Sequence, residues 1–182
     1  MKKRIKSKYK IVQFGQPVLR EIAKPVTVFH HKLHELVDSL AETLYRSEDG
    51  AAIAAPQIGV SKRIVVIDYE DEYLELLNPE IISSSGTQTG YEGCLSLPGF
   101  IGNVTRAQTV KVKYQDRDGN EITIEKNGNL ARCLQHEIDH LDGILFIDKV
   151  IDKFLVHQDT DEKLKLQDVL DLSNGKNFEA TT

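Results

Sequence analysis

The sequence has few cysteines, no apolar run long enough to cross a membrane, and no internal repeat or low-complexity tract. Its 182 residues include two cysteines, Cys94 and Cys133, whose spacing does not form a disulfide framework. No stretch approaches the roughly 20 apolar residues of a transmembrane helix. The length, with 40% hydrophobic and 28% charged residues, predicts a single globular domain with a sizeable core.

Acidic residues are absent from the start of the chain, where residues 1–10 carry six basic side chains. This segment also lacks the apolar stretch of a secretory signal. We predict a solvated basic N-terminal tail over 1–10, with contact to ribosomal RNA as the alternative. Since six of the 23 Lys and Arg residues lie there, 17 remain against 28 acidic residues, a charge of about −11. That charge argues against specific nucleic-acid binding by the rest of the chain.

The most informative motif is QHEIDH at residues 135–140, which places His136 and His140 four residues apart. On a helix these residues share one face, so both imidazoles could bind one metal ion. Glu137 would lie close to the metal without binding it, and could take the proton of a water that the metal activates. The alternative is an ordinary exposed helix with two histidines and two acids.

A catalytic metal site of this type usually has three protein ligands and an open position for water. No candidate stands out downstream of the helix, whereas Cys94 lies upstream in the run EGCLS at 92–96. A lone cysteine is more often a small buried hydrophobe, so this assignment depends on its combination with QHEIDH. Cys133 shares the helical face of the histidines and could be mistaken for a ligand. We predict instead that Cys133 is buried next to the site.

A third segment, GAAIAAPQIG at residues 50–59, is rich in small side chains. Small residues would let a substrate backbone approach closely, and Gln57 offers an amide donor. The alternative is a tightly packed turn before a strand.

Together the three segments resemble the peptide deformylase family. That family carries Gly-x-Gly-Leu-Ala-Ala-x-Gln, Glu-Gly-Cys-Leu-Ser and Gln-His-Glu-x-Asp-His in this order, and the second and third match fully here. The resemblance covers about residues 9–150. It implies removal of the formyl group from the N-terminal formylmethionine of new polypeptides, with release of formate.

The resemblance also implies the cofactor, partners and location. It implies one divalent metal ion, Fe(II) foremost, with Zn, Ni or Co as alternatives. The expected partner is a formylmethionyl nascent peptide, with a contact to the ribosome near the exit tunnel and no membrane. The expected location is the bacterial cytoplasm, and a thiolate ligand fits such a reducing compartment.

Roles for individual residues follow from the resemblance. The implied metal ligands are Cys94, His136 and His140. Glu137 would be the general base and acid, and Gln57 and the backbone N–H of Leu95 would donate to the formyl oxygen. Glu92 and Asp139 would orient the ligands. The expected substrate contacts, those of Ala51 and Ile53 through their backbone, are Gly50, Ala51, Ala52, Ile53, Gly93, Arg106, Arg132 and Cys133.

Several positions depart from the family pattern. Ala52 replaces the usual second glycine and narrows the substrate path, and Ile53 replaces leucine. Asn129 and Arg132 stand where apolar residues commonly line the methionine pocket. We expect Arg132 to face solvent. If it lines the pocket instead, the preference for methionine is in question.

The expected fold is α+β, a single domain over 11–172 with antiparallel strands packed around a central helix that carries the HExxH motif. Residues 173–182 would form a disordered tail. Hydrophobic periodicity and turn residues predict the elements. Helices are expected over 31–46, 130–141 and 163–172, strands over 63–69, 73–77 and 81–84, a hairpin of 110–114 with 122–125, a loop at 86–90 and a turn at 98–99.

Two other functions remain compatible with the sequence. A broader metallopeptidase would need a cleft with room on both sides of the scissile bond. A metal-binding paralogue without turnover would be indicated by loss of Glu137 or Gln57, and both are present.

Overall fold

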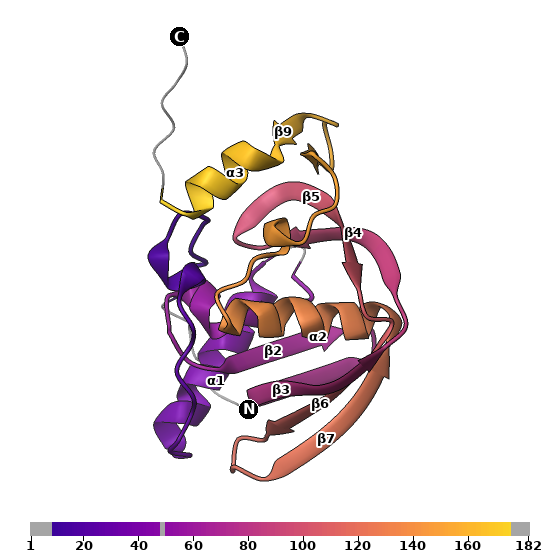
Figure 1. Ribbon diagram of the computed structural model, residues 1–182. Coiled ribbons are helices and arrows are strands. Elements are labelled where there is room, and N and C mark those ends of the chain that lie inside the picture. The colour runs from indigo at the N-terminus through magenta and orange to yellow at the C-terminus, as the bar shows by residue number, and fades with distance from the viewer. Residues whose placement is uncertain (1–8, 48–49, 176–182) are drawn as a thin grey trace.

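The computed structural model describes residues 9–47 and 50–175 (Figure 1). Three α-helices, nine strands and three short 3-10 helices are present in this part of the chain. In chain order they are η1 (Pro17–Arg20), α1 (His31–Tyr45), β1 (Ala52–Ala54), η2 (Ala55–Ile58), β2 (Ile64–Tyr69), β3 (Glu72–Ser85), β4 (Gln88–Cys94), β5 (Leu97–Arg106), β6 (Thr109–Gln115), β7 (Glu121–Asn127), α2 (Gly128–Leu141), η3 (Phe146–Asp148), β8 (Phe154–His157), β9 (Lys163–Lys165) and α3 (Leu166–Ser173).

One antiparallel sheet, in the order β1-β2-β3-β6-β7, is covered by a helix on each face. Strand β2 contacts both helices, because its successive side chains point to opposite faces of the sheet. Val65 and Ile67 pack in the cluster that includes α2, and Ile64 and Val66 pack in the cluster that includes α1. A strand buried on both faces needs apolar residues at every position, which accounts for the continuous run IVVI.

The second antiparallel sheet, in the order β4-β5-β8-β9, lies on the other side of α2 from the first (Figure 1). A third apolar cluster joins Val104 of β5 to Phe146 of η3 and Val169 of α3. Arg20 fastens this region to the N-terminal segment, because its guanidinium donates to both carboxylate oxygens of Asp148 (2.5 and 3.0 Å) and to the hydroxyl of Ser173 (2.6 Å).

The α+β class with antiparallel sheets is confirmed, and α2 carries the whole QHEIDH motif. The structure also contains the expected helix near 31–46 and the hairpin, as β6 and β7. Figure 1 shows α2 running between the two sheets. Among the described residues, no helix is both long and apolar enough to cross a membrane.

Three predictions for strands, loops and turns are wrong. Residues 73–77 and 81–84 belong to one strand, β3, because a bulge between Leu77 and Glu80 accommodates Pro79, which lacks a ladder donor. The segment 86–90 is not a loop throughout, since β4 begins at Gln88. The expected turn at 98–99 lies inside β5, and the chain reverses earlier, at Leu95 and Ser96.

At the C-terminal end, residues 163–172 do not form one helix. Lys163–Lys165 pair with β8, so α3 begins only at Leu166. Helix α3 extends to Ser173, which is buried, so the described structure passes beyond residue 172. The expected disordered tail lies largely outside the described residues, as does most of the basic N-terminal segment.

Gly143 lies two residues after the last residue of α2, and we expect Gly143→Ala to destabilise the protein. Gly143 has φ of +70°, and an added Cβ would lie 2.5 Å from the backbone oxygen of Arg20. The free energy of unfolding should fall by about 1–3 kcal/mol or more, since backbone strain and the clash add. Gly128, at the other end of α2, is the control, because it has φ of +60° but no atom within 4 Å of an added Cβ. Equal losses for both variants in urea titrations would rule out the clash.

Candidate active site

Two elements bring the three expected metal ligands together. His136 and His140 project from α2, and Cys94 ends β4. Their ligand atoms all lie within 4.8 Å of one another, and Cys94 Sγ is 3.4 Å from His140 Nε2. One thiolate and two imidazoles at this spacing form a donor set that suits a divalent transition metal.

A buried carboxylate sets the orientation of His136. Glu92 accepts from His136 Nδ1 at 3.0 Å, which leaves Nε2 of that ring for a metal. Arg106 donates to both carboxylate oxygens of Glu92, at 2.8 and 2.9 Å, and also to Asp139. Burial opposes ionisation of Glu92, but the hydrogen bonds from Arg106 and His136 outweigh it and hold its pKa below the usual range. Glu92 is therefore a carboxylate, the form that supports a ligating histidine.

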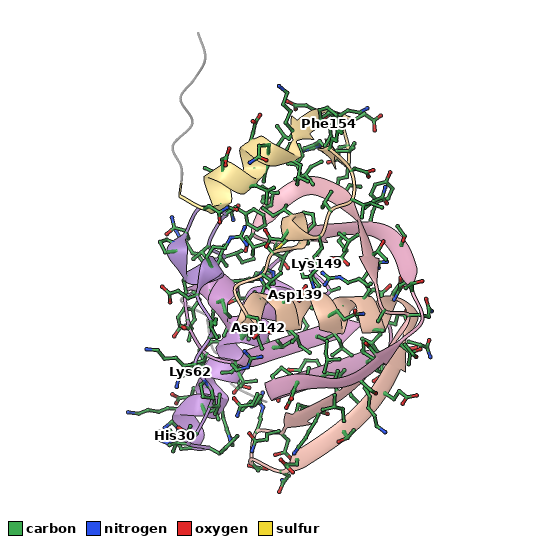
Figure 2. The ribbon with its side chains drawn as sticks, viewed as in Figure 1. His30, Lys62, Asp139, Asp142, Lys149 and Phe154 are labelled. Atoms are coloured by element: carbon green, nitrogen blue, oxygen red, sulfur yellow. The ribbon has the colours of Figure 1, made fainter. Side chains whose placement is uncertain are left out.

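Asp139 connects this charged group to the surface. Figure 2 shows Asp139 and Lys149 on the same side of α2, and Lys149 Nζ donates to Asp139 at 3.0 Å. Alternating charges thus run from Lys149 through Asp139 and Arg106 to Glu92 and the metal-binding face of His136. The arrangement fixes the histidine without leaving a buried charge unpaired.

Glu137 lies beside the ligands with one oxygen unused. The side chain is buried, and its Oε2 has no hydrogen-bond partner in the described structure. Burial raises the pKa of Glu137 to about 7. A carboxyl group poised near neutral pH, with a free oxygen beside a metal-binding cluster, can accept and return a proton. His140 Nδ1 is likewise buried without a partner within the described part of the chain.

Gln57 presents its amide to the same place. Its Oε1 accepts from the backbone N–H of Ala54 at 2.8 Å, which fixes the side chain. The Nε2 atom then lies 3.5 Å from Cys94 Sγ and 3.5 Å from Ser96 Oγ. Leu95 and Ser96 form the turn that follows Cys94. An oriented amide donor therefore stands next to the candidate metal position.

Gln57, Cys94, His136 and Glu137 line a pocket of about 700 Å³, which is within the usual range for small-molecule sites, whereas His140 is buried behind the lining. The expected residues in its lining are Gly50, Ala51, Ala52, Gln57, Gly93, Cys94, Leu95, Asn129, Arg132, Cys133, His136 and Glu137. Burial raises the pKa of the Cys133 thiol, so this cysteine stays neutral. Cys133 lines the pocket but does not belong to the ligand cluster.

Three expectations need correction. Arg106 does not line the pocket; its guanidinium is committed to Glu92 and Asp139, so it supports a ligand rather than touching substrate. Ile53 is fully buried in the core that includes α1 and is not in the lining either. Arg132 does not face solvent; it is buried and lines the pocket, with its guanidinium bound to Glu92 and backbone carbonyls. The preference for methionine therefore needs a test with a formyl-methionyl substrate.

Ser96, the last residue of the EGCLS run, is fully buried against Gln57 and is not itself in the pocket lining. Several lining residues gave no signal in the sequence, among them Tyr69, Tyr91, Phe100, Ile101 and Gln158. Gln158 follows β8, and its backbone N–H donates to the Gly99 carbonyl at 2.8 Å. It reaches the site because β8 pairs with β5, a long-range pairing that local patterns do not predict.

Comparisons with known proteins agree with this geometry. The family model described as Polypeptide deformylase matches residues 8–154. The peptide deformylase of Pelotomaculum thermopropionicum is 52% identical over 141 residues, 78% of this chain and 90% of that protein. The peptide deformylase of Thermoanaerobacter sp. (strain X514) is 49% identical over 163 residues, 90% of this chain and 95% of that protein.

Solved structures show the same likeness. The Thermotoga maritima peptide deformylase has a TM-score of 0.77 and 42% identity, covering 79% of this chain and 98% of that one. The Synechococcus elongatus peptide deformylase, solved in complex with actinonin, has a TM-score of 0.80 and 36% identity, covering 100% and 94%. With its metal-binding cluster, its poised glutamate and these likenesses, the chain belongs to the polypeptide deformylase family.

Proposed function

We propose that this protein removes the N-formyl group from the methionine at the start of newly made polypeptides and releases formate. The observation that carries the proposal is the convergence of Cys94, His136 and His140 within 4.8 Å, beside a buried Glu137 with a free oxygen. Hydrolysis of an amide-like bond needs an activated water, a proton carrier and an oxyanion donor. The pocket lining offers a residue for each need.

One divalent metal ion would be held by Cys94, His136 and His140. The donor set fits such an ion, because His136 Nδ1 is already committed to Glu92 and Cys94 Sγ lies 3.4 Å from His140 Nε2. When bound, the ion would lower the pKa of a water molecule and polarise the formyl oxygen. We propose Fe(II) as the native ion, with Zn, Ni or Co also compatible with these ligands.

The protein's own groups would carry the proton and hold the developing charge. Glu137 Oε2 would take a proton from the attacking water as the bond to the formyl carbon forms. Gln57 Nε2 and the backbone N–H of Leu95 would donate to the formyl oxygen as it becomes negative. Glu137 would then deliver its proton to the departing amine nitrogen as the carbon–nitrogen bond breaks, which leaves formate and a free amino terminus.

The peptide would lie along the free edge of β1, which is the outermost strand of its sheet in the described structure. Asp68 N–H donates to the Ala51 carbonyl at 2.9 Å, so ladder alternation turns the polar backbone groups of Ala52 toward the open edge. An extended peptide could add there as a further strand. Ala52 would then be the closest backbone contact, and its methyl group would narrow the path compared with glycine.

We also propose where the protein works. The protein would act on nascent chains at the ribosome, in the bacterial cytoplasm. The six basic residues of segment 1–10 would favour contact with ribosomal RNA. The rest of the chain is acidic, so any such contact should depend on that segment and weaken with salt.

The direct test is formate release from a formyl-methionyl tripeptide by protein loaded with Fe(II) without oxygen. The matched substrate is the same tripeptide without the formyl group. Formate from the first and no free amino acid from the second is the expected result. Release of amino acids from the unformylated peptide would instead favour a broader metallopeptidase, and one bound metal without any turnover would favour a binding paralogue.

Gln57→Ala should slow the reaction without removing the metal. Loss of one oxyanion donor typically costs about 3 kcal/mol of barrier, or about 10²- to 10³-fold in kcat. The variant also leaves the Ala54 N–H without its acceptor, so some stability should be lost as well. Steady-state kinetics and metal content on the folded variant separate these effects. An unchanged kcat would remove Gln57 from the mechanism.

A further inference from the structure

Arg132 is bound on several sides by a single hairpin. Its Nη1 donates to Glu92 at 2.8 Å, to the Val104 carbonyl at 3.0 Å and to the Gly90 carbonyl at 3.4 Å. Its Nη2 donates to the Gln88 carbonyl at 3.3 Å. All four acceptors lie on β4 or β5. The guanidinium is therefore held in one position by the β4–β5 hairpin and is not free in solvent.

Gly90 makes this close approach possible. A Cβ added at Gly90 would lie 3.4 Å from Arg132 Nη2 and 3.6 Å from its Cζ. A side chain larger than alanine at this position would have to occupy the space of the guanidinium. Gly90 and Arg132 thus form a complementary pair, one on each element.

The two elements that Arg132 joins carry the two halves of the ligand set. Arg132 lies four residues before His136 on α2, so both side chains share a face of the helix. Gln88, Gly90 and Glu92 alternate along β4, which ends at Cys94. Arg132 therefore connects α2, which carries both histidines, directly to β4, which carries Cys94.

Glu92 accepts hydrogen bonds from Arg132, Arg106 and His136. Its Oε1 accepts from both Arg132 and Arg106, and its Oε2 accepts from His136 Nδ1. Arg106 connects Glu92 to Asp139 on α2. Among the described side chains that donate to Glu92, only Arg132 also donates to backbone carbonyls of β4 and β5.

We propose that Arg132 is a positioning residue that fixes Cys94 relative to His136 and His140, and so sets the affinity and geometry of metal binding. A planar guanidinium with several donors can fix orientation in a way that a single ammonium cannot. Supporting residues of this kind typically change metal affinity 10- to 100-fold when replaced. The inference rests on the proposed metal site, but it does not depend on turnover.

The test compares Arg132→Met with the same change at Arg63, an arginine that contacts the opposite, C-terminal end of α2. Arg63 donates to the Leu141 carbonyl at 3.1 Å and to Asp142 at 2.6 Å, so it fastens the end of α2 without touching β4. Each protein is loaded with Co(II), and its dissociation constant is measured by chelator competition. The visible absorption of bound Co(II) reports ligand geometry, and urea titration reports stability.

Arg132→Met should raise the Co(II) dissociation constant about 10- to 100-fold and change the absorption spectrum. Arg63→Met should lower the midpoint of unfolding but leave metal binding within about twofold of wild type, because it does not hold β4. The Co(II) dissociation constant of Arg132→Lys should lie between those of the wild type and Arg132→Met. An ammonium group restores the positive charge beside Glu92 but not the several donors of the planar guanidinium. If Arg132→Met does not fold, Arg132→Lys and Gly90→Val carry the same test.

A loss of stability in Arg132→Met with unchanged Co(II) affinity and spectrum would overturn the proposal, as would equal losses of metal affinity in both arginine variants. Failure of the wild-type protein to bind Co(II) would instead contradict the proposed metal site. The two failures are therefore distinguishable.

Discussion

Glu137→Gln should lose formate release almost completely while its metal and fold remain. Glutamine has the size of glutamate, but its neutral amide cannot accept the proton of the attacking water or return it to the leaving amine. General acid–base groups typically contribute about 10²- to 10⁴-fold, and both proton transfers depend on Glu137. We therefore expect a loss at the upper end of that range. Formate release and metal content, measured on the same samples, check this.

The same substitution should stabilise the metal-free protein at neutral pH. Burial raises the pKa of Glu137 from 4.5 to about 7, so the folded apoprotein binds this proton more tightly than the unfolded chain. The folded state therefore loses stability as the pH rises from about 4.5 to 7, by about 3 kcal/mol at most. Glutamine removes that loss. Urea titrations of both apoproteins at several pH values test this, and parallel pH profiles would contradict it.

Cys94→Ala should weaken metal binding more than replacement of any residue that only orients a ligand. Cys94 Sγ is one of three ligand atoms in the cluster and lies 3.4 Å from His140 Nε2. Since loss of a residue that only orients a ligand typically costs 10- to 100-fold in affinity, loss of the thiolate should cost more than about 100-fold. Chelator competition measures the dissociation constant, and formate release should fall with it.

Cys133→Ser is the matched control for the cysteine prediction. Cys133 lines the same pocket, but burial raises its pKa and it lies outside the ligand cluster. Metal content should therefore stay at one equivalent in this variant. Loss of metal from Cys133→Ser, with retention in Cys94→Ala, would mean that the two cysteines have been assigned the wrong way round.

Much of the site could be predicted from local sequence because its parts are local. The four-residue spacing of His136 and His140 is a property of one helix, and Glu137 follows from the same turn. Cys94 lies 42 positions before His136 in the numbering, so periodicity could not place it beside the histidines, and its prediction rested on its combination with QHEIDH and on the family resemblance. The structure brings these residues together as the resemblance implied.

What the sequence could not reveal depends on contacts between distant elements. Arg132 was expected in solvent because helix position alone does not show that β4 and β5 would surround its guanidinium. Arg106 was expected near substrate, and only the fold shows that Glu92 and Asp139 engage it. Within β3, Asn78 and Pro79 look like a strand end, yet Asn78 accepts from Val26 N–H at 2.7 Å and the strand continues.

The measurement that tests the central claim most directly is an Fe(II) titration of the metal-free protein without oxygen, with formate release from a formyl-methionyl tripeptide as the readout. Activity should rise in proportion to added metal and stop at one equivalent. Cys94→Ala and Glu137→Gln should show no such rise under the same conditions. Formate release by the metal-free protein, or full activity in either variant, would contradict the assignment of deformylation to this cluster.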